Sequence, residues 1–136
     1  MILIQCVSSK KDETLPARDL YDSTYFESMK RYAEATGEPW AILSAKHGLV
    51  APNETLEPYD AFGLSETQAV EIATELSNQD VEGVELIAGE KYTTPLVPAL
   101  EGVGITVVER CKGLPIGKRV QKLQEWSRSL ENKTLC

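Results

Sequence analysis

Short apolar runs alternate along the chain with segments in which apolar residues recur at helical spacing. The runs at 2–7, 40–43, 84–88 and 105–108 predict strands. Most of their positions are apolar without strict alternation, as in strands that are covered on both faces of a sheet. The helical spacing predicts helices between Thr24 and Gly37, over 95–100, over 116–130 and after Ser65.

Capping signals mark where two of these helices begin. Thr24 and Glu27 fit a capping box, with Asp22 and Ser23 as rival caps, and Ser65 with Gln68 forms a second match. The segment 44–60 contains glycine and prolines and predicts a loop that is longer than most connections between elements. Long loops in compact domains are often functional.

Strands that alternate with helices predict an α/β fold, here a single three-layer α/β/α domain over residues 1–136. We expect a mostly parallel sheet of about four strands, with a loose end from about residue 131. Right-handed crossovers place the carboxyl ends of all parallel strands at one edge of the sheet. Side chains that follow the strands are therefore expected to lie close together.

The net charge of the chain disfavours some classes of binding partner. The chain carries 14 Lys and Arg against 21 Asp and Glu, a net charge of −7, which disfavours sequence-independent binding to duplex DNA. Nucleic acid remains compatible with a local basic cleft. No apolar run approaches the length of about 20 residues that spans a bilayer, so no membrane association is expected.

The first residues and the cysteines predict a cytoplasmic protein. The apolar start, 1–7, lacks a positively charged segment and indicates a strand rather than a signal peptide. Three cysteines occur without a CxxC pair or a zinc-type spacing with histidine. No cofactor and no metal site are predicted, although Glu57 and Asp60 can help ligate Mg²⁺ beside a phosphate.

Cations follow each predicted strand of this acidic chain. They are Lys10 and Lys11, then Lys46 and His47, then Lys91, then Arg110 and Lys112. In open α/β sheets the carboxyl edge is where ligands bind. The pattern predicts an anion site at that edge.

The first two loops hold the main candidates. Ser8, Ser9 and Lys10 offer hydroxyl, backbone N–H and ammonium donors to an anion, although a solvated turn explains them equally well. There is no GxGxxG or Walker A motif. In the second loop the candidates are the only histidine, His47, and its neighbours Ser44, Lys46 and Gly48. His47 can act as a general acid or base, or can merely hydrogen-bond its own loop.

Further candidates lie in the remaining loops. Tyr59 can stack on a flat ring, and Asp60 can orient His47, act as a base or cap a helix. Arg18 and Tyr21 precede the first helix; Arg18 suits a phosphate or a surface ion pair. Gly89 permits close backbone approach, and Tyr92 offers a ring and a hydroxyl, with structural roles as the alternative for both.

Several of these segments recur together, in this order, in a family of small microbial and phage proteins. They are 4–11, 16–21, the Ser-Ala-Lys-His-Gly-Leu block at 44–49, 58–60 and 88–92. The chain resembles that uncharacterised domain family over nearly its whole length. More distantly, the Gly-Leu-Val and Pro-Tyr-Asp segments resemble the YaaA peroxide-stress proteins and a glycosylase-like domain of archaeosine synthases. Those resemblances imply a nucleobase, a nucleotide or a nucleic acid as the ligand, and they assign no reaction.

Three hypotheses follow from these residues. In the first, the protein is a hydrolase-like enzyme that cleaves or exchanges an N-glycosidic bond of a nucleotide-type ligand, with catalytic groups Lys46, His47 and Asp60. Its ligand-binding residues are Ser8, Ser9, Lys10, Arg18, Tyr21, Ser44, Gly48, Tyr59, Gly89 and Tyr92. In the second, the same pocket binds a nucleotide or a nucleic-acid end without catalysis. In the third, the basic edge receives an acidic protein partner.

Overall fold

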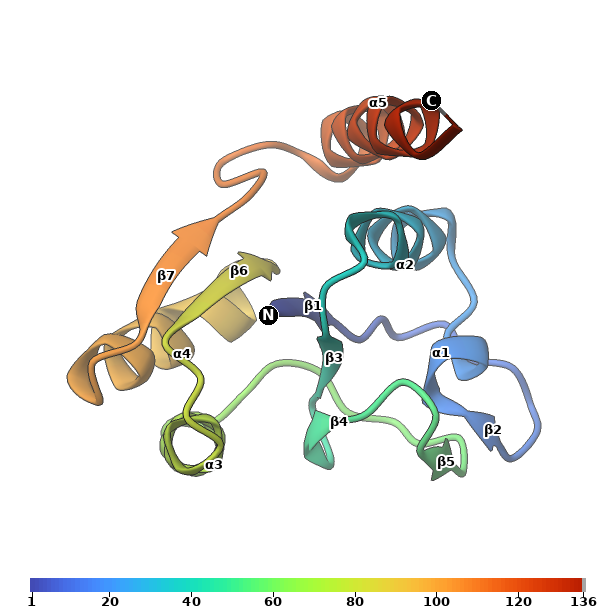
Figure 1. Ribbon diagram of the computed structural model, residues 1–136. Coiled ribbons are helices and arrows are strands. Elements are labelled where there is room, and N and C mark those ends of the chain that lie inside the picture. The colour runs from blue at the N-terminus through green and yellow to red at the C-terminus, as the bar shows by residue number, and fades with distance from the viewer. Residues whose placement is uncertain (136) are drawn as a thin grey trace.

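A five-stranded sheet forms the centre of the structure, a computed structural model that describes residues 1–135 (Figure 1). The strand order is β4-β3-β1-β6-β7. Strands β1, β3, β6 and β7 are parallel, and β4 is antiparallel to β3. A second, two-stranded sheet joins β2 and β5. The strand bounds are Ile2–Gln5, Leu15–Pro16, Trp40–Ser44, Gly48–Val50, Thr55–Leu56, Gly83–Ile87 and Thr106–Glu109 for β1 to β7.

Helices cover both faces of the main sheet. Helix α2 packs against α5 on one face, and α3 packs against α4 on the other (Figure 1). The helix bounds are Ala17–Leu20, Thr24–Thr36, Glu66–Asn78, Glu90–Gly102 and Ile116–Leu135 for α1 to α5. The expected α/β class with a mostly parallel sheet is confirmed.

The observed helix starts agree with the capping signals. The capping box expected of Thr24 and Glu27 is wrong, since Thr24 is the first residue of α2; the rival cap Ser23 is the N-cap, and its hydroxyl accepts a hydrogen bond from the N–H of Phe26 at 3.0 Å. The capping box of α3 is present, with Ser65 and Gln68 bonded reciprocally. Helix α5 also includes the residues from Glu131 to Leu135, where the sequence predicts a loose end.

Helix α4 is much longer than the segment 95–100 that the sequence predicts. Pro95 and Pro98 lie inside it, and each lacks the N–H that would bond to the carbonyl four residues earlier. The carbonyl left free by Pro95 is that of Lys91, which instead accepts from the N–H of Leu64 at 3.0 Å. The proline is tolerated because the loop before α3 supplies the missing donor.

The segment 44–60 is also more ordered than a simple loop. It contains β4, which pairs with β3 through a hairpin that turns at residues 45–47; Gly48, the first residue of β4, has a φ of +75°. It also contains β5, which pairs with Leu15 and Pro16. These short pairings hold the segment against the body of the domain.

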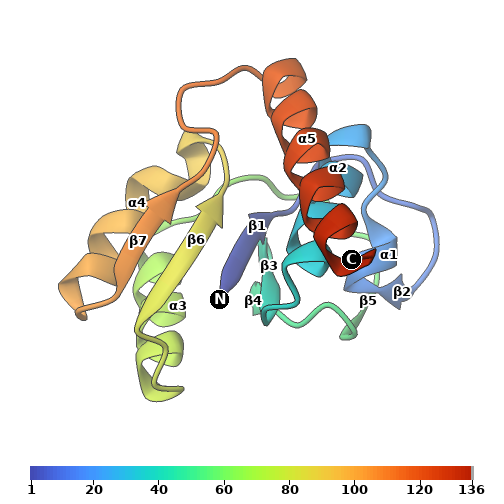
Figure 2. The ribbon, with the colours of Figure 1, turned by 45° about the horizontal axis from the view of Figure 1, so that its top comes forward.

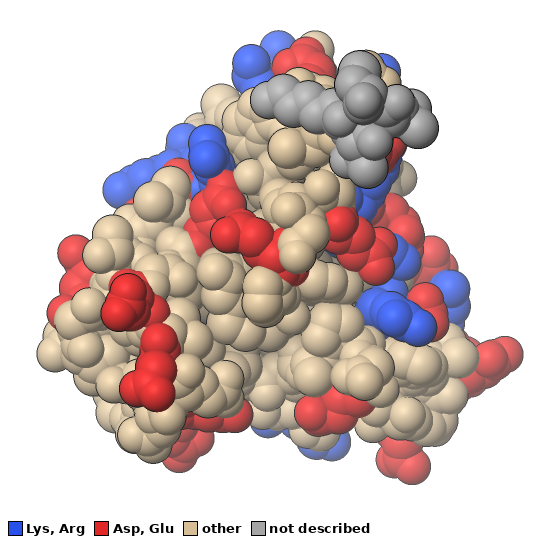
Figure 3. Space-filling model, viewed as in Figure 1, with Lys and Arg blue, Asp and Glu red and all other residues tan. Residues whose placement is uncertain are grey.

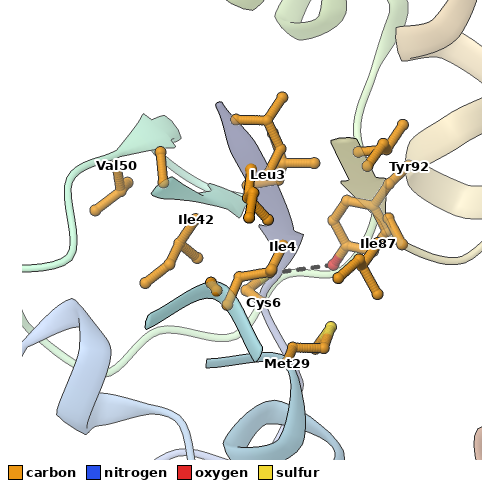
Figure 4. Packing of buried hydrophobic residues seen from close by; sticks show 14 of the residues in the cluster. Leu3, Ile4, Cys6, Met29, Ile42, Val50, Ile87 and Tyr92 are labelled. Carbon is orange, nitrogen blue, oxygen red and sulfur yellow. Dashed lines mark hydrogen bonds between the residues drawn. The ribbon is translucent and has the colours of Figure 1, made fainter. Parts of the chain in front are cut away.

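Strand β1 lies at the centre of the core. Ile2, Leu3 and Ile4 are fully buried, and their neighbours in Figure 4 come from β3, β4, β6, α2 and α4.

No helix within residues 1–135 combines the length and the apolar composition needed to cross a membrane.

The order of the parallel strands creates a crevice. The chain leaves β1 for β3 on one side, and the later strands β6 and β7 lie on the other side of β1. Where the order reverses, between β1 and β6, successive connections run over opposite faces and leave an opening at the carboxyl ends. Figure 2 shows β6 and β7 pointing toward the end of the molecule where the chain enters α5.

Truncating a side chain on the central strand should lower the free energy of unfolding far more than truncating a side chain on an edge strand. We expect Ile4→Ala to reduce the free energy of unfolding by about 2–5 kcal/mol, because it leaves a cavity between both helical layers. Val108→Ala, which truncates an exposed side chain on the edge strand β7, should cost less than about 1 kcal/mol. Urea denaturation of both variants measures this, and equal losses would contradict the central position of β1.

Candidate functional site

A cavity of about 630 Å³ opens at the crevice between β1 and β6. Gln5, Val7, Ser8 and Ser9 line it from the end of β1, and Gly89 lines it from the residue before α4. We call this cavity the cleft. Ser8, Ser9 and Gly89 are thus brought together from two loops, as expected for residues that follow neighbouring parallel strands.

The beginnings of three helices surround the cleft. Thr24 and Tyr25 are the first two residues of α2, Gly89 is the N-cap of α4, and Ile116 is the first residue of α5. The first N–H groups of a helix have no intrahelical partner, and the helix dipole gives this end a partial positive charge. The cleft therefore lies where three positive helix ends converge.

A buried arginine supplies a full positive charge to the cleft. Arg119, in the first turn of α5, is only 8% exposed. Its Nε donates to the carbonyl of Leu114 at 2.8 Å, and its Nη1 donates to Tyr25 Oη and the Ala88 carbonyl, both at 3.1 Å. Within residues 1–132 no carboxylate forms a salt bridge with this guanidinium, and its Nη2 has no hydrogen-bond partner.

Gln5 fixes the floor of the cleft. Its Oε1 accepts from the N–H of Gly89 at 2.7 Å, and its Nε2 donates to the carbonyl of Cys6 at 3.0 Å. The side chain is buried and connects the end of β1 to the start of α4. The spacing between the two loops is therefore set by hydrogen bonds as well as by the sheet.

Two large apolar side chains stand at the rim of the cleft. Phe62, on the loop before α3, is 59% exposed, and Ile116 is 61% exposed. The Phe62 ring meets the ring of buried Tyr92 edge to face, with centroids 5.5 Å apart. A charged floor with an apolar rim suits a ligand that has an anionic part and a flat apolar part.

A group of polar side chains lies beside the cleft; we call Lys10, Tyr21, Ser44 and Tyr59 the tyrosine cluster. The Tyr59 hydroxyl lies 2.5 Å from that of Tyr21, and Ser44 Oγ donates to it at 2.8 Å. Lys10 Nζ lies 4.3 Å from the centroid of the Tyr59 ring and donates to the carbonyls of Val7 and Ser8. The cluster thus contacts the same loop that lines the cleft.

The predicted catalytic residues Lys46, His47 and Asp60 are exposed and are not among the residues that line the cleft. The backbone N–H groups of Lys46 and His47 donate to Ser44 Oγ, which explains this turn structurally. The His47 ring meets the Tyr59 ring edge to face at 5.3 Å.

The remaining predicted site residues have local roles. Arg18 is exposed on α1, 3.9 Å from Asp19, and does not approach the cleft lining. Tyr92 is fully buried, and its hydroxyl lies 3.1 Å from Cys6 Sγ (Figure 4). Gly48 is the first residue of β4 and pairs with Ser44.

Two of the predicted cations are paired on the surface. Arg110 and Lys112 form ion pairs with Glu85 and Glu109. On the face shown in Figure 3, acidic side chains are widespread and basic ones form small separate groups.

No group of three potential metal ligands occurs in the described part of the chain.

Sequence reasoning did not single out Arg119, Tyr25, Phe62 or Gln5. One signal was available for Arg119, which lies three residues after Ile116 and four before Leu123, on the apolar stripe of the final helix. A cation at an inward-facing position of an amphipathic helix needs a partner or a ligand. Phe62 and Tyr25 have no comparable signal, because only the fold brings them to the cleft.

The chain belongs to a family of unknown function, DUF6884, whose model matches residues 1–125. It is also similar to the uncharacterized protein YfjM of Bacillus subtilis strain 168, with 34% identity over 89 residues. That match covers 59% of this chain and 59% of the relative, so the chain spans less than two thirds of its length. No solved structure matches the chain.

The pKa values of the tyrosine hydroxyls are all shifted in the same direction, upward. Burial is the main cause that raises the pKa of all five above the usual value of about 10, for Tyr21 to about 12. Burial also lowers the pKa of Lys10, with Cys6 and Asp60 opposing the shift. A raised tyrosine pKa means that the folded state favours the neutral phenol.

We expect stability to fall as the pH rises above about 10, since the unfolded chain then loses phenolic protons that the folded chain keeps. Phenolate absorbance should therefore rise together with the loss of far-ultraviolet circular dichroism. Tyr21→Phe should weaken the pH dependence between about 10 and 12, the window set by its raised pKa. Phenolate absorbance that rose near pH 10 in a folded protein would contradict the burial of these groups.

Proposed function

We propose that this chain binds a nucleotide-type ligand in the cleft, with its phosphate at Arg119 and its base at the apolar rim. The observation that carries the proposal is the buried guanidinium, which faces a cavity and has no carboxylate partner within residues 1–132.

The electrostatics of Arg119 favour an anionic ligand. A buried charge is costly unless it is paired, and neutral oxygens satisfy only part of this guanidinium. A phosphate at Nη2 would complete its hydrogen bonds and neutralise its charge. The free N–H groups at the start of α2 provide further donors on the same side of the cleft.

The rim supports a ligand that contains a flat ring. Phe62 exposes most of its ring beside the cleft, where a base can stack on it at about 1–3 kcal/mol. The resemblance to YaaA proteins and to the glycosylase-like domain of archaeosine synthases also supports a nucleobase. An apolar ring and a phosphate together describe a nucleotide better than a simple sugar phosphate.

Cleavage or exchange of the N-glycosidic bond is the second candidate function. One observation favours it, namely a chain of contacts that connects His47 to the cleft. The His47 ring contacts the Tyr59 ring, and Lys10 lies over that same ring. Lys10 in turn donates a hydrogen bond to the Ser8 carbonyl beside the cleft. His47 or Asp60 would then move the proton to or from the base. We place binding first because none of the described residues that line the cleft carries a carboxylate or an imidazole.

A new carboxylate at the rim should abolish binding without harming the fold. Ile116→Glu introduces it at an exposed first residue of α5, where the helix dipole tolerates a negative charge. We expect nucleoside monophosphates to stabilise the wild type in a thermal-shift screen, by about 2.7 kcal/mol at 100 times Kd, and to leave Ile116→Glu unchanged. Val70→Glu, at an exposed apolar position on α3, is the matched control and should bind normally.

Arg119→Gln should weaken binding by about tenfold to a hundredfold, the range for a hydrogen bond to a charged group. Isothermal titration calorimetry gives the affinities, and mass spectrometry of the same mixtures detects any released base. Normal binding by both Ile116→Glu and Arg119→Gln would overturn the proposed site. Released base that disappears in His47→Ala would establish the second candidate.

A further inference from the structure

We propose that the cleft selects a terminal phosphate monoester in its dianionic form, with the nucleoside directed outward between Phe62 and Ile116. The inference rests on the proposed function and goes beyond it, because a nucleotide-type ligand can equally carry a phosphodiester with a single negative charge.

The charge of the cleft matches two negative charges better than one. Arg119 contributes a full positive charge, and each of the three helix ends contributes up to about half a charge. The described lining contains no carboxylate to offset them. A phosphate monoester carries about two negative charges near neutral pH, whereas a diester carries one.

The burial of the Arg119 guanidinium favours a phosphate that lies at the end of the ligand. Arg119 is 8% exposed and bonds to the Ala88 carbonyl at the end of β6, whereas Phe62 and Ile116 are more than half exposed. The exposure therefore increases from the guanidinium to the apolar rim. A terminal phosphate needs one covalent connection toward the rim, while a diester needs room for two.

The donors also suit three free phosphate oxygens. Arg119 Nη2 and the N–H groups of Thr24 and Tyr25 are available at the cleft. Ser23 accepts from Phe26, so its own hydroxyl proton can be donated to a ligand. A monoester presents three terminal oxygens to such donors, and a diester presents two.

The test compares ligands on the wild-type protein, so it does not depend on a variant that folds. Calorimetry would measure the 5′- and 3′-monophosphates of each common ribonucleoside, their methyl phosphodiesters and the free nucleosides. We expect each methyl ester of a binding nucleotide to bind at least about tenfold more weakly, the loss expected for one charge-assisted hydrogen bond. Free nucleosides should bind more weakly still.

The outcomes separate this inference from the proposed function. Equal affinities for a monoester and its methyl ester would overturn the dianion preference while nucleotide binding stood. No binding by any of the compounds would overturn both.

A second experiment distinguishes two ligands that carry the same terminal phosphate, the end of a nucleic-acid strand and a free nucleotide. Short single-stranded oligonucleotides with a terminal phosphate would be compared with the same strands ending in a methylated phosphate. Tighter binding of the phosphorylated strand than of the free nucleotide would identify nucleic-acid ends as the source. Binding of free nucleotides alone would identify the mononucleotide pool, and either result would support the inference.

Discussion

The parallel pairing of β1 with both β3 and β6 is the constraint on which the rest of the structure depends. Because β1 is hydrogen-bonded on both edges and covered on both faces, Ile2, Leu3 and Ile4 are apolar, and the polar Gln5 at its carboxyl end is satisfied by hydrogen bonds. The next strand of the main sheet, β3, lies on one side of β1, and the later strands β6 and β7 lie on the other. The crevice follows from that order, before any side chain is considered.

The same constraint explains why the cleft is electropositive in an acidic protein. Helix α2 lies in the connection from β1 to β3, and α4 and α5 follow β6 and β7, so all three begin at the carboxyl edge of the sheet. Their positive ends therefore converge there. Arg119 adds a full charge at the point where Gln5 and Gly89 hold the two loops together. Topology supplies a weak preference for anions, and one side chain on α5 strengthens it.

The parallel strands and most of the helices could be anticipated because they depend on local patterns, whereas the strand order could not. Apolar runs, a glycine stop at Gly37 and the box at Ser65 act within a few residues, and each predicted the corresponding element. The length of α4 could not be anticipated, because the partner of the Lys91 carbonyl comes from a distant loop.

The site itself was only partly predictable. Ser8, Ser9 and Gly89 follow strands directly, so the topology rule was enough to bring them together. Arg110 and Lys112 satisfied the same rule, yet each has a nearby carboxylate, which position along a strand cannot reveal. Arg119 does not follow a strand directly; it lies in the first turn of α5, which begins at the same edge.

The charge distribution also bears on which anions can reach the cleft. With a net charge of −7, the protein repels a long polyanion at distances up to about the screening length of 8–10 Å. In the proposed function, a mononucleotide or a single strand end brings few charges near the acidic surface, and its phosphate binds at Arg119 after leaving bulk water. The acidic exterior and the buried guanidinium thus act together, because the first disfavours extended nucleic acid and the second favours a small anion. If the proposed function holds, this combination is the physical reason why a protein with a net charge of −7 binds a phosphate.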